Sequence, residues 1–64
     1  MVNIFLELKM KTKEAIDFYN GSVQALANAL GVTRFAVYRW GEFPPMLRQF
    51  QLERITDGKL KPDA

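Results

Sequence analysis

The chain has 64 residues, a formal net charge of +2, and neither cysteine nor histidine. That length predicts one small domain over residues 1–64, and the missing residue types exclude disulfides, thiolate metal sites and imidazole as a general base. No apolar run approaches the ~20 residues of a membrane helix and no secretory leader is recognisable, so we expect a cytoplasmic protein without membrane contacts.

Residues 1–10 are expected to form an N-terminal arm. Apolar and polar residues alternate over residues 2–8, with Phe5 as the exception, and a period of two is typical of a strand. Two interpretations stay open: a short strand that pairs with its copy in a second subunit, and a disordered or partly helical arm.

Two short helices are predicted after the arm. Thr12 is the candidate N-cap of the first, KEAIDFY, which ends at the Asn-Gly pair at 20–21. Ser22 is the candidate N-cap of the second, VQALANAL, and Gly31 ends it because glycine readily adopts a positive φ.

Two further helices complete an all-α domain of four to five helices. Thr33 is the candidate N-cap of a helix over residues 34–40. Pro44 and Pro45 then break the chain, and a C-terminal helix is predicted over residues 45–57. The last six residues, KLKPDA, are expected to be a polar tail.

Residues 23–40 have the pattern of a helix-turn-helix. Ala27 is small where the next helix crosses over it, and Gly31 supplies the left-handed backbone of the turn. Val37 and Trp40 lie three residues apart and fasten the second helix of the pair to the core. The buried set is completed by Leu26, Leu30 and Val32.

Burial of those residues leaves one side of the 34–40 helix facing outward. Such a helix fits the major groove of B-form DNA, which is ~12 Å wide, and the excess of basic residues in this part of the chain suits a polyanion. Arg34 is expected to read guanine and Phe35 to meet a thymine methyl group. Tyr38 either meets a thymine methyl group as well or donates its hydroxyl to a phosphate. The predicted DNA-binding residues are Ser22, Gln24, Thr33, Arg34, Phe35, Tyr38 and Arg39, with non-specific attraction added by Lys11 and Lys13.

Plainer interpretations stay open for the same residues. Exposed arginines are often only solvated, and Phe35 or Tyr38 could pack against the protein itself. The whole face could also bind another protein instead of DNA. Salt separates these alternatives, because affinity for duplex DNA falls steeply with ionic strength and an aromatic protein interface barely responds.

One recognition helix reads few base pairs, so a homodimer on a pseudo-palindromic site is expected. Three surfaces are candidates for its interface: the C-terminal helix, the loop before it, and the N-terminal arm. The preferred interface combines Leu52 and Ile55, a surplus apolar arc of the C-terminal helix, with Phe43 in the loop. Pairing of residues 2–8 with their copy is the next choice.

Two segments resemble a known family. GSVQALANALGVTRFAVYRW, residues 21–40, resembles without a gap the helix-turn-helix of the Cro-like repressors of lambdoid phages and prophages, including the YdaS-type proteins. LERITDGKLKPD, residues 52–63, is similar to the ending of the YdaS-type branch, although Asp57 stands where glycine is usual. The resemblance covers residues 11–63 and implies a λ-repressor-like, all-helical fold. It implies an operator-binding dimer with base contacts at Thr33, Arg34, Phe35, Tyr38 and Arg39.

The sequence therefore predicts a sequence-specific DNA-binding repressor of a bacterial host cell, with double-stranded operator DNA and a second copy as partners. No enzyme activity, cofactor, metal or small-molecule ligand is predicted, because no paired carboxylates or glycine-rich phosphate loop can be recognised. The alternatives are an antitoxin or autoregulator of a toxin–antitoxin pair, and a helical protein-interaction module.

Overall fold

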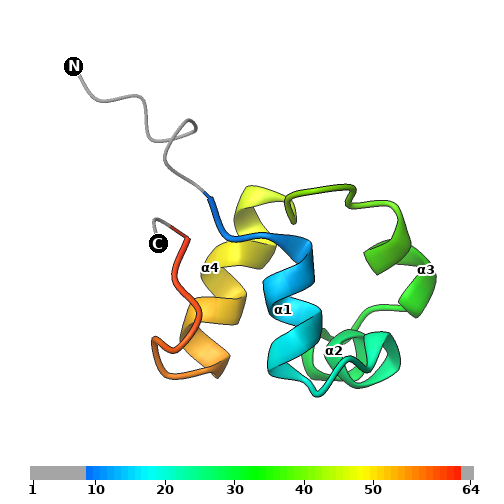
Figure 1. Cartoon of the computed structure of the whole chain (residues 1–64), viewed down its shortest axis with the longest axis horizontal. Helices are drawn as coiled ribbons and strands as arrows, with labels where there is room; N and C mark the ends of the chain where they lie inside the picture. The colour runs from blue at the N-terminus through cyan, green and yellow to red at the C-terminus, as the bar shows by residue number, and fades with distance from the viewer. Residues whose placement is uncertain (1–8, 63–64) are drawn as a thin grey trace.

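The computed structural model describes residues 9–62, which form four helices: α1 (Thr12–Phe18), α2 (Val23–Leu30), α3 (Arg34–Tyr38) and α4 (Met46–Ile55). Within that range there is no strand, so the prediction of a small all-α domain is confirmed. The strand considered for residues 2–8 lies outside the described residues. In Figure 1, α3 and α4 lie on opposite sides of the pair formed by α1 and α2.

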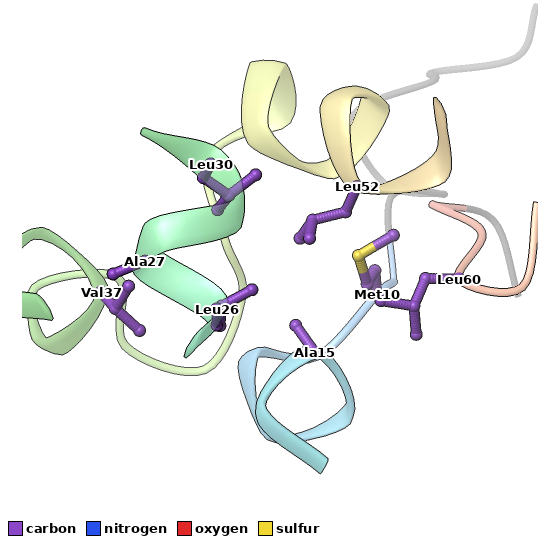
Figure 2. Packing of buried hydrophobic residues seen from close by; sticks show 8 residues of the cluster. All are labelled: Met10, Ala15, Leu26, Ala27, Leu30, Val37, Leu52 and Leu60. Carbon is purple, nitrogen blue, oxygen red and sulfur yellow. The ribbon is translucent and has the colours of Figure 1, made fainter. Parts of the chain in front are cut away.

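The core lies between α1, α2 and α4 and extends under α3 (Figure 2). The predicted burial of Leu26, Ala27, Leu30 and Val37 is confirmed. Trp40 and Val32 differ from the prediction, because both are only half-buried at the edge of this core. The fully buried apolar set is Met10, Ala15, Leu26, Ala27, Leu30, Val37, Leu52 and Leu60.

The start of α1 differs from the prediction that Thr12 is its N-cap. Lys11 is the N-cap, and its backbone N–H donates to Glu14 Oε1 at 2.9 Å. Thr12 is the first helical residue and is buried, and its N–H donates to the carbonyl of Glu42 at 2.9 Å. This hydrogen bond connects α1 to the loop that follows α3. It is a long-range contact that no local sequence pattern predicts.

The two ends of the described chain are bound to each other. Met10 belongs to the core, and the backbone N–H groups of Lys9 and Met10 donate to the carbonyl of Pro62. Leu60 is also in the core, so the prediction of a polar tail is wrong. The lysines at 59 and 61 give the tail its polar composition, but the apolar residues between and after them point inward.

α4 begins one residue later and ends two residues earlier than predicted, with Pro45 and Thr56 as its caps. Its buried side consists of Gln49 and Leu52, followed by Thr56. The side-chain amide of Gln49 donates to the carbonyl of Pro44 at 2.9 Å, which offsets part of the cost of burying a polar group.

The prediction that Leu52 and Ile55 form an apolar dimer surface is therefore wrong for Leu52. Leu52 is fully buried, whereas Ile55 is exposed. The hydrophobic side chains that α4 leaves in solvent are Met46, Leu47, Phe50 and Ile55.

Candidate nucleic-acid interface

The turn between α2 and α3 is fixed by local hydrogen bonds, as predicted. The Ser22 hydroxyl accepts from the N–H of Ala25 at 3.0 Å and starts α2. Gly31 ends α2 with φ 73°, and the N–H of Val32 donates back to the carbonyl of Ala27 at 3.0 Å. A Cβ atom at Gly31 would meet no atom within 4 Å, so glycine is required here by the backbone angle and not by space.

α3 is a single short helix that begins at a side-chain cap. The Thr33 hydroxyl accepts from the N–H of Ala36 at 3.3 Å, which confirms the predicted N-cap. The helix ends at Tyr38 instead of continuing to residue 40, and Arg39 is its C-cap. The N–H of Trp40 donates to the carbonyl of Val37, three residues back, so the chain tightens and leaves the helix there.

The outward side of α3 carries arginine and aromatic side chains together. Val37 is buried against the core, while Arg34, Phe35, Tyr38 and Arg39 are exposed. Arg34 Cζ lies 5.1 Å from the centroid of the Phe35 ring, within the range of a cation–π contact. The Phe35 and Tyr38 rings pack edge to face, with centroids 6.2 Å apart. The interpretation of Phe35 as a core-packing residue is wrong, since its side chain is more than half exposed.

The remaining predicted residues lie at the N-terminal ends of the two helices. Thr33 and Ser22 are exposed caps, and each hydroxyl still has its hydrogen available because it serves the helix as an acceptor. Gln24 is exposed in the first turn of α2, where its amide donates to Asn28 Oδ1 at 2.9 Å. The α2–turn–α3 unit therefore presents hydroxyl, amide and guanidinium donors.

Comparison with known proteins shows the family to which this chain belongs. Residues 11–64 match the family model described as DNA-binding transcriptional regulator Cro. The chain belongs to this Cro family. It is 40% identical over 52 residues to the regulatory protein cro of Salmonella phage P22, an alignment that covers 81% of this chain and 84% of that relative. No solved structure matches the chain significantly.

The Cro-like resemblance seen in the sequence is thus confirmed, and this member of the Cro family is a DNA-binding transcriptional regulator. DNA is its partner. In the described residues 9–62, no helix has the length and apolar character needed to cross a membrane.

Of the two lysines expected to attract DNA, one is engaged within α1. Lys13 Nζ lies 2.8 Å from Asp17 Oδ2, one turn along the helix. The hydrogen bond and charge of that carboxylate raise the pKa of Lys13, and they also offset its positive charge. Lys11 is exposed at the start of the same helix.

A residue that the sequence did not single out connects the helix-turn-helix to α4. The side-chain amide of Gln51 donates to the carbonyl of Leu30, at the end of α2, at 3.3 Å. Arg48 Nη1 donates to the oxygen of the same amide at 2.7 Å and holds it in place. One glutamine on a helix has no recognisable pattern, so only the structure identifies it.

Proposed function

We propose that this Cro family member is a repressor that binds a pseudo-palindromic operator as a dimer, with α3 of each copy in the major groove. It acts on operator DNA inside a bacterial host cell. The observation that carries the proposal is the exposed row of Arg34, Phe35, Tyr38 and Arg39 on a helix whose opposite side is buried through Val37.

Each exposed side chain has a role suited to its chemistry. Arg34 stands in the first turn of α3, where its forked guanidinium can bond to O6 and N7 of one guanine. Phe35 and Tyr38 supply apolar contact with thymine methyl groups. Arg39, at the C-terminal end, binds the phosphate backbone.

The caps of the two helices contribute the remaining contacts. The hydroxyls of Ser22 and Thr33 and the amide of Gln24 donate to phosphate oxygens or base edges. The first turn of α2 adds backbone N–H groups that favour an anion.

Selection from a random pool of duplexes, followed by sequencing, tests the proposal. We expect enrichment of an inverted repeat whose half-sites lie about 10 bp apart, centre to centre. Affinity for the enriched duplex should fall steeply with salt. Enrichment of no sequence, or binding that salt leaves unchanged, would contradict it.

The outer row of α4, defined as Met46, Leu47 and Phe50, is the surface we assign to the second copy. All three side chains are at least two-fifths exposed, and a depression beside them is lined by Leu47, Phe50, Gln51 and Arg54. A row of large apolar side chains on so small a domain is typical of a protein interface. Phe43, in the loop before α4, is similarly exposed.

Two observations favour a second copy as the occupant. α3 has only five residues, so one domain contacts few base pairs and needs a partner domain on the same duplex. The bond from Gln51 to the end of α2 couples α4 to the helix-turn-helix, so that pairing through α4 fixes the separation of the two α3 helices. Because α3 and α4 lie on opposite sides of the domain, both surfaces can be occupied together (Figure 1).

The oligomeric state of Leu47→Lys tests this interface. Leu47 is 72% exposed, so the substitution should leave the fold intact while it places a charge in the dimer contact. We expect sedimentation to show a weaker dimer, and the two copies to bind the two half-sites of an operator independently instead of cooperatively. Lys59→Glu, an exposed change outside the row, is the control. Unchanged sedimentation of Leu47→Lys would exclude this surface.

A further inference from the structure

α3 has few contacts of its own, although a dimer that reads two half-sites requires it to keep a fixed position relative to α4. It has five residues, and Val37 is its one fully buried side chain. In Figure 1, α3 and α4 lie on opposite sides of the pair formed by α1 and α2, and α3 packs on α2 and not along α4. The position of α3 relative to α4 therefore depends on the segments at the two ends of α3.

The segment before α3 is bonded to α4 through Gln51. The side-chain amide of Gln51 donates to the carbonyl of Leu30 at 3.3 Å. Leu30 is the last residue of α2, and the carbonyls in the last turn of a helix have no partner within the helix. Arg48 Nη1 donates to the oxygen of the same amide at 2.7 Å and keeps the NH₂ group directed toward Leu30. A side chain of α4 thus satisfies a carbonyl at the start of the turn into α3.

The segment after α3 is bonded to α4 through Gln49. Its side-chain amide donates to the carbonyl of Pro44 at 2.9 Å. Gln49 is 2% exposed, and among the described residues its Oε1 atom has no hydrogen-bond partner. Burial of an unpaired acceptor costs free energy, which offsets the gain from the bond to Pro44. The net contribution of Gln49 to stability is therefore small, and what this residue supplies is a fixed position for the loop after α3.

Two glutamines of one helix thus hold both sides of the same short segment. The carbonyls of Leu30 and Pro44 lie before and after α3 in the chain, and the two glutamines stand two positions apart on α4. Hydrogen bonds are directional, so one at each end of a segment restrains its rotation as well as its distance from α4. Packing of the single residue Val37 restrains rotation less.

We propose that Gln49 and Gln51 are positioning residues for DNA recognition, which hold α3 at a fixed place relative to α4. They act through the carbonyls of Leu30 and Pro44 and need no contact with DNA. The proposal rests on the proposed dimer through α4, and it adds the device by which that dimer selects the spacing of its half-sites. Each copy contributes one rigid connection between the surface that pairs and the helix that reads.

The spacing of the half-sites provides the functional test. One base pair is inserted at the centre of the highest-affinity duplex from the random pool, and the dissociation constants for the inserted and original duplexes are compared. In the double variant Gln49→Met/Gln51→Met the ratio of these constants should fall at least about fivefold, the smallest effect expected from the loss of two hydrogen bonds. The reason is that binding to the inserted duplex no longer has to break them.

Single variants separate positioning from other effects of the substitutions. Methionine resembles glutamine in length but lacks its donor, so Gln49→Met should fold, and circular dichroism checks this. Gln49 is buried and outside the outer row of α4, so this variant alters no part of the dimer contact. Its midpoint of thermal unfolding should change by no more than about 8 °C, while its spacing ratio falls. Glu53→Met is the matched control on the same helix, because a carboxylate cannot donate to a carbonyl.

A distance measurement within one copy tests the same idea without DNA. The chain has no cysteine, so spin labels can be attached at Tyr38→Cys on α3 and Arg54→Cys on α4, both exposed positions. Pulsed electron paramagnetic resonance gives the distribution of distances between them, with excess unlabelled chain added so that each dimer holds at most one labelled copy. We expect the distribution to broaden in the double glutamine variant. Labels at Lys13→Cys and Arg54→Cys, on α1 and α4, should show no change.

The outcomes separate this proposal from the one on which it rests. An unchanged α3–α4 distribution, or a spacing ratio equal to that of the parent chain, overturns the positioning role. Equal broadening for both label pairs also overturns it, because a general loss of structure would then explain the result. If the parent chain shows no preference for spacing, the proposed dimer fails, and a broadened α3–α4 distribution still supports the positioning of α3 by the two glutamines.

Discussion

α3 and α4 both expose large apolar side chains, but their neighbours differ. On α3, Phe35 and Tyr38 lie among arginines, and the helix contains no acidic residue. On α4, Leu47 and Phe50 lie near another exposed apolar side chain, Met46, and the depression that they line also includes Gln51 and Arg54. The comparison teaches that apolar exposure marks a candidate binding surface on both helices. We assign α3 to DNA because its rings are in contact with Arg34, and α4 to protein because its exposed side chains are mainly aliphatic.

The two helices are also held differently. α3 is short, is capped by the Thr33 hydroxyl, and has Val37 as its one fully buried residue. α4 has ten residues and no side-chain cap, and it is held by Gln49 and Leu52 in the core. Local hydrogen bonds position α3, and core packing positions α4.

The largest expected effect comes from two leucines of α4. Leu52 is 0% exposed and Leu47 is 72% exposed. Leu52→Ala should cost about 2–5 kcal/mol of unfolding free energy, because it leaves a cavity in the core, and a core of this size supplies only about 3–5 kcal/mol. Leu47→Ala should change the stability of the monomer by no more than about 0.5 kcal/mol. Urea titration followed by Trp40 fluorescence measures both, and equal losses would mean that the two sides of α4 are misassigned.

Arg34→Ala sharpens the assignment of α3 to DNA. We expect a loss of roughly 1–3 kcal/mol for the preferred site and relaxed preference at one base pair. Lys59→Ala removes the same charge from an exposed position beyond α4, and it should leave the preference unchanged. Repeated selection from the random pool measures both variants. A loss that is uniform over all sequences would reduce Arg34 to a phosphate contact.

Gly31→Ala tests the backbone that sets the angle between α2 and α3. Gly31 has φ 73° in open space, so the cost is conformational and should be about 1 kcal/mol of unfolding free energy. Gly31→Asn should cost less, because asparagine tolerates the left-handed region better than alanine. Thermal unfolding without DNA gives both values, and an alanine variant as stable as the parent chain would show that the turn adopts another conformation.

The smallest expected effect is that of the α3 cap. Thr33→Ala removes the acceptor for the Ala36 N–H, and since the bond is 3.3 Å long we expect a loss of about 0.5–1 kcal/mol. Thr33→Ser retains the hydroxyl and should behave like the parent chain. Stability measured without DNA separates this effect from any contact of Thr33 with an operator.

The sequence by itself determined the helix-turn-helix. Ser22, Gly31 and Thr33 could be recognised because their caps and turn involve hydrogen bonds to residues at most five positions away. Exposure of the residues on α3 followed from the burial of Val37, at helical spacing. These features are local, so a local pattern is enough to predict them.

Only the tertiary structure decided how the rest of the chain meets the core. Leu52 points inward and Leu47 outward although they are the same residue type on one helix, because the path of α4 is set by its contacts with α2 and with the loop after α3. Met10 and Leu60 enter the core from opposite ends of the chain. Whether such a residue points into the core depends on which distant segments pack together. A short stretch of sequence does not determine the free energy of those contacts.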